Sequence, residues 1–285
     1  MMLDIPYGFS SGRCPTLYHY TSLDGARAIL ASNSLWVTDH VSMNDTSEFN
    51  YAEARLFALL RQGCAKLDPV MRMLVIGVVS GMHDAIGLFI GSLTARGDNL
   101  GQWRSYADTG RGCALEINAD FLEFDAGTAI RTIVYDEQVA DAVICAGLTV
   151  VQDRFEETPE DGETLLDYAR WLAASLFAIK HPGFADEREV RISRMVVRDE
   201  TGGYIATAGN RGDGVSTLAL PVFARRSAFG DTHSLALPLR RDDGTSAIKG
   251  IALGPAMPPA TVIEVTKEFE ALGLTVRQSA LPYRC

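Results

Sequence analysis

The stretch Leu17-Tyr-His-Tyr-Thr-Ser22, near the start of the chain, decides how the fold is interpreted. Its aromatic and polar residues alternate with the two-residue period of a strand, so His19 and Thr21 share one face. Ser22 then stands where a helix N-cap is expected, and apolar residues follow at helical spacing. Asn33 tolerates the left-handed conformation that ends many helices. The pattern therefore predicts a short strand followed by one helix that ends near Asn33.

Across the rest of the chain, helices and strands do not alternate strictly. The patterns predict helices at residues 48–62, after Pro69, and at 99–107, 164–179 and 261–272. They predict strands at residues 35–37, 88–93, 111–117, 130–135, 187–192, 248–253 and 274–277. This order favours an α+β fold with a mainly antiparallel sheet over a doubly wound one. Residues 1–15 are expected to form an irregular lead-in, and residues 16–285 a single domain.

Composition narrows the class of protein. The chain has 285 residues, 47% of them hydrophobic, and a net charge of -10, which disfavours extended contact with a nucleic-acid backbone. Five widely spaced cysteines without a C-x-x-C pair, and the lack of a signal-peptide pattern, favour the cytoplasm. The most apolar stretch, residues 71–93, carries His83 and Asp84 at its middle. A buried helix followed by a strand is therefore expected there, and no membrane span.

Several common catalytic motifs are missing from the sequence. It has no G-x-G-x-x-G after a strand, no P-loop, no H-E-x-x-H and no G-x-S-x-G. The dipeptide His83-Asp84 is weak support for a metal-dependent phosphohydrolase, which stays open as a minor alternative. No metal ligands are assigned.

Several further segments follow the opening stretch along the chain. They are Ser34-Leu-Trp36, Phe89-Ile-Gly-Ser-Leu-Thr94, Gln102-Trp-Arg-Ser-Tyr-Ala-Asp108, Lys180-His-Pro-Gly-Phe184, Glu187-x-Glu189-Val-Arg191 and residues 251–255. In order and spacing they resemble the bacterial family known as domain of unknown function 2971, from residue 16 to residue 283.

The opening segment is also similar to the first motif of ADP-ribosyltransferases of the His-Tyr-Glu kind. That resemblance implies a split, mainly antiparallel sheet with peripheral helices, and NAD as a substrate. Its histidine, which orients the NAD ribose, falls on His19, and its catalytic glutamate falls on Glu189 or Glu187. The aromatic residue that stacks on nicotinamide is left open between Trp36, Trp103 and Tyr106. The NAD-binding residues that the resemblance implies are Thr21, Tyr20, Trp36, Trp103, Arg104, Tyr106 and Arg191.

These residue types suit cleavage of the bond between nicotinamide and ribose. Positive charge moves onto the sugar in the transition state, and a carboxylate there stabilises it. In a strand, Glu187, Glu189 and Arg191 would share one face, and Arg191 would pair with Glu187 or with the pyrophosphate of NAD. The expected function is an ADP-ribosyltransferase or NAD glycohydrolase, a toxin or phage-defence effector with a protein or nucleic-acid acceptor and an antitoxin as a further partner. The alternative is a non-catalytic module that binds a nucleotide or a partner.

Ordinary structural roles compete with these assignments. His19 can be a half-buried histidine with satisfied hydrogen bonds, and the charges at 187–191 a paired strand face. Trp103 and Tyr106 lie three residues apart, so at least one is expected in the core. Asn44, Asp45 and Glu48 are expected to form a turn and a helix cap, or else to line the cleft.

Overall fold

The strand around His19 is β1 (Thr16–Thr21) in the computed structural model of the protein, followed by α1 (Leu23–Ser32) and β2 (Ser34–Asp39). The structure describes residues 14–42, 47–81, 86–122, 128–198, 204–205, 222–227 and 230–283. The Ser22 side chain accepts a hydrogen bond from the backbone N–H of Gly25 at 3.0 Å, and Asn33 is left-handed with φ 47°. Both predicted ends of this helix are confirmed, because each residue satisfies the terminus as its chemistry requires.

The other elements complete an α+β chain. The helices are α2 (Ser47–Gln62), α3 (Pro69–Ser80), α5 (Leu100–Tyr106), α6 (Glu137–Glu157), α7 (Gly162–Leu176) and α8 (Pro259–Ala271). Short 3-10 helices are η1 (His40–Ser42), η2 (Asp108–Gly110) and η4 (Pro182–Glu187). The strands are β3 (Ile86–Thr94), β4 (Cys113–Asn118), β5 (Ala129–Thr132), β6 (Glu189–Arg198), β7 (Tyr204–Ile205), β8 (Val222–Ser227), β9 (Gly230–Pro238), β10 (Ile248–Leu253) and β11 (Thr275–Gln278).

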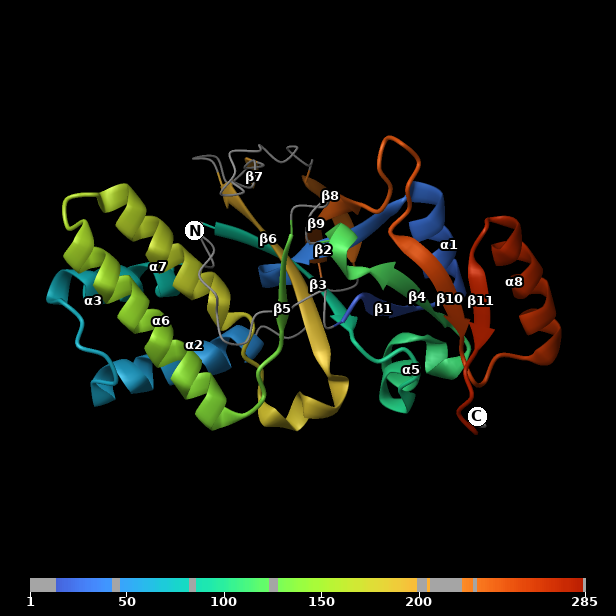
Figure 1. Ribbon diagram of the computed structural model, residues 1–285, viewed down its shortest axis with the longest axis horizontal. Helices are drawn as coiled ribbons and strands as arrows, with labels where there is room; N and C mark the ends of the chain where they lie inside the picture. The colour runs from blue at the N-terminus through green and yellow to red at the C-terminus, as the bar shows by residue number, and fades with distance from the viewer. Residues whose placement is uncertain are drawn as a thin grey trace.

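The described strands form one sheet whose main path runs β11-β10-β4-β1-β3-β2-β9-β8 (Figure 1). Every pair of strands is antiparallel except β10 with β11, so the predicted mainly antiparallel α+β architecture is confirmed. The sheet branches at β3. One edge of β3 pairs with β6 along its whole length, from Ile86 to Thr94. Its other edge pairs with β1 only at Thr94 and with β2 only at Phe89 and Ile90. β1 and β2 therefore contact different parts of that edge.

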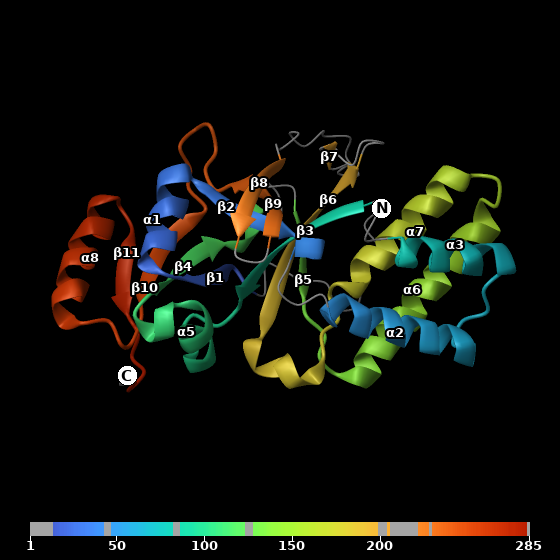
Figure 2. The ribbon, with the colours of Figure 1, turned by 180° about the vertical axis from the view of Figure 1, so that it is seen from behind.

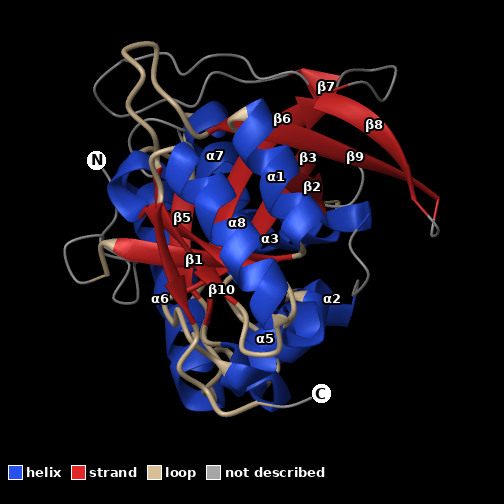
Figure 3. Ribbon diagram, turned by 90° about the vertical axis from the view of Figure 1, so that its right-hand side faces the viewer, coloured by secondary structure: helices blue, strands red, loops and turns tan. Residues whose placement is uncertain are grey.

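The two faces of the sheet are covered by different helices. Figures 1 and 3 place α1 and α8 over one face, and the largest apolar core lies beneath them. Figure 2 places α2, α3, α6 and α7 together at the other end of the molecule, where a second apolar core includes Leu88 and Ile90 of β3. Because side chains alternate along a strand, Ser92 and Thr94 continue the face of Leu88 and Ile90. That face is apolar under the helices and becomes polar beyond them.

A third, small core lies under α5. It brings together Tyr20 of β1, Trp103 and Ala107 at α5, Ala114 of β4 and Ala252 of β10. This contact fixes α5 next to the polar end of β3.

Some elements differ from the sequence-based expectations. The 164–179 helix is α7, which ends earlier, at Leu176, with its apolar side buried as expected. Helix α6 and strands β8 and β9 have no counterpart among the predicted elements. Residues 71–93 form α3 and β3, as predicted, but α3 buries only one face: Val70 and Met73 are 64% and 76% exposed. Within the described residues, none of the helices combines the length and apolarity that a bilayer crossing requires.

Several expectations fall outside the described residues. Residues 1–13 of the expected lead-in, Asn44, Asp45, His83 and Asp84 are among them, and the Glu48 side chain is not described either.

Candidate functional site

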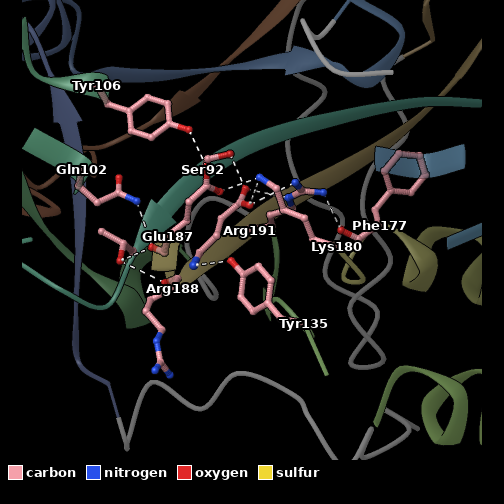
Figure 4. Close-up of polar contacts among 11 residues, drawn as sticks. Ser92, Gln102, Tyr106, Tyr135, Phe177, Lys180, Glu187, Arg188 and Arg191 are labelled. Atoms are coloured by element: carbon pink, nitrogen blue, oxygen red, sulfur yellow. Dashed lines mark hydrogen bonds and ion pairs between the residues drawn. The ribbon is translucent and has the colours of Figure 1, made fainter. Parts of the chain in front are cut away.

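Two carboxylates and two cations, from the connection between α7 and β6 and from the start of β6, meet beside β3 (Figure 4). Lys180 Nζ lies 2.7 Å from Oε2 of Glu187 and 3.2 Å from Oε2 of Glu189. Arg191 Nε lies 2.8 Å from Oε1 of Glu189. The side chains of Lys180, Glu189 and Arg191 are nearly fully buried, whereas that of Glu187 is 23% exposed. The cluster therefore has a buried inner part and one carboxylate that reaches toward solvent.

Glu189 is fully engaged by hydrogen-bond donors. Its Oε1 accepts from the Ser92 hydroxyl at 2.6 Å and from Arg191 Nε at 2.8 Å. Its Oε2 accepts from Lys180 Nζ and from Arg191 Nη2, each at 3.2 Å. Burial acts to raise the pKa of Glu189, but Arg191, Lys180 and Ser92 outweigh it and hold the pKa below its usual value. A carboxylate offers about four acceptor positions, and here all are used.

Glu187 keeps acceptor capacity. Its Oε1 accepts from the Tyr106 hydroxyl at 3.1 Å, and its Oε2 from Lys180 Nζ at 2.7 Å. Two of its roughly four acceptor positions therefore remain for other donors. Of the two glutamates that the sequence left open, Glu187 is the one with room for a ligand.

A left-handed residue sets the spacing of the two glutamates. Arg188, with φ 48°, lies between η4 and β6, and Figure 4 shows its side chain directed away from the cluster. The Thr94 hydroxyl lies within hydrogen-bond distance of the carbonyl oxygens of Glu187 and Arg188, at 3.3 and 3.1 Å. Gln102 Nε2 donates to the Glu187 carbonyl at 3.0 Å. Glu187 is thus not part of the strand, contrary to the expectation, yet the turn aims it at the same lysine as Glu189.

The α5 helix separates the two aromatic residues of its segment. Trp103 is fully buried, donates to Asp98 Oδ1 at 2.7 Å and packs edge-on against Tyr20. Tyr106 is 51% exposed and donates to Glu187. Burial, followed by the charge of Glu187, raises the pKa of Tyr106 to about 12, so its hydroxyl stays protonated and a donor. The stacking role assigned to an aromatic residue is therefore sterically open to Tyr106 and closed to Trp103.

His19 approaches the cluster through Ser92. Its Nδ1 lies 3.4 Å from the Ser92 carbonyl oxygen, while the Ser92 hydroxyl donates to Glu189. Burial lowers the pKa of His19, which favours the neutral imidazole. His19 pairs with Leu115, whose side chain lies in the core under α1 and α8. The strand register thus directs His19 to the face opposite Glu189, at the point where β1 separates from β3.

Four other predicted residues lie away from the cluster. The Tyr20 hydroxyl donates to the Arg96 carbonyl at 2.9 Å, and its ring is buried in the small core under α5. Thr21 packs against the first turn of α1: a Cβ at Gly25 would lie 2.2 Å from its Oγ1. Trp36 is 47% exposed and contacts Phe223 of β8, and Arg104 lies over the ring of Tyr283. Within the described part of the chain, none of these four side chains bonds to the carboxylates of the cluster.

Sequence reasoning gave no role to Ser92, Gln102, Tyr135 or Lys180, although each has a bond within the site. Ser92, Gln102 and Lys180 lie in segments that resemble the family of unknown function, and that resemblance was the available signal. The Tyr135 hydroxyl accepts from the Glu189 backbone N–H at 3.0 Å. Arg191 donates through Nη1 to the Phe177 carbonyl at 2.9 Å, closing the end of α7. Among the residues that the structure describes, no cluster of three His, Cys, Asp or Glu side chains suits a metal ion.

A comparison with protein-family models matches residues 102–192 to the family described as Protein of unknown function (DUF2971). The match covers about a third of the chain and includes Gln102, Tyr106, Lys180, Glu187 and Glu189, but neither His19 nor Ser92. It supports the resemblance to this family over that segment. Searches of curated proteins and of solved structures gave no significant match.

Proposed function

We propose that the protein cleaves the bond between nicotinamide and ribose in NAD, as an ADP-ribosyltransferase or an NAD glycohydrolase. The observation that carries the proposal is the free acceptor capacity of Glu187, a half-buried carboxylate held between Tyr106 and Lys180. A carboxylate so placed suits a sugar that becomes cationic in the transition state.

The reaction divides among the residues as follows. The carbon–nitrogen bond breaks with both electrons going to nicotinamide, which leaves as a neutral base. Glu187 accepts a hydrogen bond from a ribose hydroxyl and faces the cationic sugar, and Tyr106 offers its half-exposed ring to the pyridinium. Water or a nucleophile of the macromolecular acceptor then bonds to the sugar carbon and loses its proton.

Two further residues act by position. Glu189 holds Lys180 and Ser92 in place, and we treat it as a positioning residue because its acceptor positions are filled. His19, neutral with Nδ1 toward Ser92, keeps Nε2 for a ribose hydroxyl. Because His19 and Glu189 lie on opposite faces of the sheet, this role requires the sugar to pass between β1 and β3, which pair only at Tyr18 and Thr94.

The test is release of nicotinamide from NAD carrying a label on that base, with and without candidate protein and nucleic-acid acceptors. We expect release by the wild type, and its loss in Glu187→Gln and His19→Ala. Glu160→Gln, at an exposed position in the turn between α6 and α7, is the matched control. An intact NAD pool with every acceptor class, together with no detectable NAD binding, would rule the proposal out.

A non-catalytic nucleotide-binding module is the second candidate. It is favoured by the charge balance of the cluster, in which Lys180 and Arg191 offset Glu187 and Glu189. Under this candidate NAD or ADP-ribose binds without nicotinamide release, and His19→Ala changes the affinity alone.

A further inference from the structure

Arg131 of β5 is a partly buried cation without a carboxylate partner in the described structure. Its Nη1 lies 3.5 Å from the Ser193 hydroxyl, the outer limit of a hydrogen bond. Burial alone lowers the pKa of Arg131, with no acidic neighbour to counter it. A guanidinium taken from water without such a neighbour is destabilising.

The strand register places Arg131 beside the carboxylate cluster. Arg131 is the cross-strand partner of Arg191 on β6, and Arg191 is the partner of Ser92 on β3. Directly opposite residues point to the same face of a sheet, so Ser92, Arg191 and Arg131 form one row across three strands. Glu189 lies on that face too, two residues before Arg191.

The two arginines of this row differ in what surrounds them. Arg191 donates through Nε and Nη2 to Glu189 and through Nη1 to the Phe177 carbonyl. Its charge and its three nitrogens are therefore engaged within the protein. Arg131 faces a like charge across the strand pair, which is unfavourable by itself, and keeps most of its five N–H donors. From the sequence, Arg191 was expected to pair with Glu187 or with the pyrophosphate of NAD, but of these two arginines the contacts leave Arg131 as the one with donors for a phosphate.

We propose that Arg131 binds a phosphate group of the ligand, which is the diphosphate if the ligand is NAD. The identification as NAD rests on the proposed function, whereas the phosphate site does not. A planar guanidinium matches the oxygens of a phosphate in a bidentate contact, and the anion would offset the charge that the fold leaves uncompensated. The residue is only partly covered in the structure, so a ligand has access to it.

The experiment measures calorimetric binding of inorganic pyrophosphate, ADP-ribose and adenosine to the full-length protein. Variants are Arg131→Gln, which removes the charge, Arg131→Lys, which keeps it, and Arg72→Gln at an exposed position of α3 as the matched control. We expect Arg131→Gln to weaken pyrophosphate and ADP-ribose about ten- to a hundredfold and to leave adenosine unchanged. Arg131→Lys should fall between the wild type and Arg131→Gln.

Stability without ligand gives a second readout. Arg131→Gln should unfold at the same or a higher denaturant concentration than the wild type, since an uncompensated charge is removed. An arginine that serves the fold would instead leave the variant less stable. Lower stability of the ligand-free Arg131→Gln protein, or unchanged pyrophosphate affinity, overturns the inference.

The two proposals fail in different ways. If phosphate binding depends on Arg131 but no nicotinamide is released, the proposed function is wrong and the phosphate site is supported, with a free nucleotide as its ligand. If Arg131→Gln releases nicotinamide with the same KM for NAD as the wild type, the phosphate site is wrong and the proposed function is supported.

Discussion

Arg191 and Glu189, two positions apart on β6, form a bidentate pair in which Nε lies 2.8 Å from Oε1 and Nη2 3.2 Å from Oε2. Both side chains are nearly fully buried. Removing one member of such a pair leaves the other charge in the interior, which is more costly than the pair itself. The pair at the centre of the site is therefore also important for the free energy of unfolding.

Glu189→Gln is expected to lower the free energy of unfolding by roughly 3–5 kcal/mol, because Arg191 and Lys180 lose their shared carboxylate. Denaturant unfolding at pH 7 measures this, with Glu160→Gln as the exposed control. The pKa of Glu189 is lowered by folding, so its contribution is present above the unfolded value of about 4.3. It is lost as pH falls from there through the folded pKa. A Glu189→Gln protein as stable as the control would contradict the pairing.

Glu187→Gln is expected to separate activity from stability. The carboxylate is partly exposed and retains neutral hydrogen-bonding capacity as an amide, so the free energy of unfolding should fall by about 1 kcal/mol. Nicotinamide release should fall by about a hundred- to a thousandfold, as for loss of one electrostatic contact to a transition state. Comparable losses of activity in Glu187→Gln and Glu189→Gln at equal folded fraction would mean that the roles are not divided as proposed.

The lowered pKa of His19 predicts that the free energy of unfolding also depends on pH in a second, higher range. Folding lowers its pKa, so the unfolded chain takes up the proton first as the pH falls. Stability from this residue is present above the unfolded pKa of about 6.5 and is lost as pH falls toward the folded value. His19→Gln should flatten the stability profile just below pH 6.5, measured by unfolding at a series of pH values. A profile identical to the wild type in that range would show that His19 is not shielded.

The aromatic residues of α5 should respond in opposite ways. Trp103→Ala empties a fully buried site and is expected to cost about 3–5 kcal/mol of unfolding free energy. Tyr106→Phe removes the bond to Glu187 and should cost about 1 kcal/mol or less, while raising the KM for NAD only slightly. Tyr106→Ala removes the ring as well and should raise the KM further. Equal KM values for the two Tyr106 variants would argue against stacking.

Local patterns predicted the elements whose ends are determined by neighbouring residues. Ser22 and Asn33 terminate α1 as their side chains dictate, and the residues of β10 match the predicted 248–253 strand. The α6 helix has apolar residues spread widely around its axis, so its periodicity is a weak signal. The β8–β9 hairpin depends on long-range pairing of β9 with β2, which no local pattern contains.

The candidate site was predictable as a set of segments and not as a set of contacts. Glu187, Glu189 and Tyr106 were named from the sequence, but the choice between the glutamates depends on which donors reach each one. Ser92 and Lys180 have no unusual spacing of their own. Their importance arises from the pairing of β3 with β6 and from the return of the chain after α7.

The left-handed turn at Arg188 constrains the number of residues between Glu187 and Glu189. Its side chain leaves the cluster, so glycine or asparagine should replace it at no loss, since both adopt positive φ readily. Deleting or inserting one residue between 187 and 189 is another matter, because it would change the turn that brings Glu187 and Glu189 to the same lysine. Relatives of this chain should therefore vary freely in the residue at position 188, whereas the number of residues between the two glutamates should hardly vary.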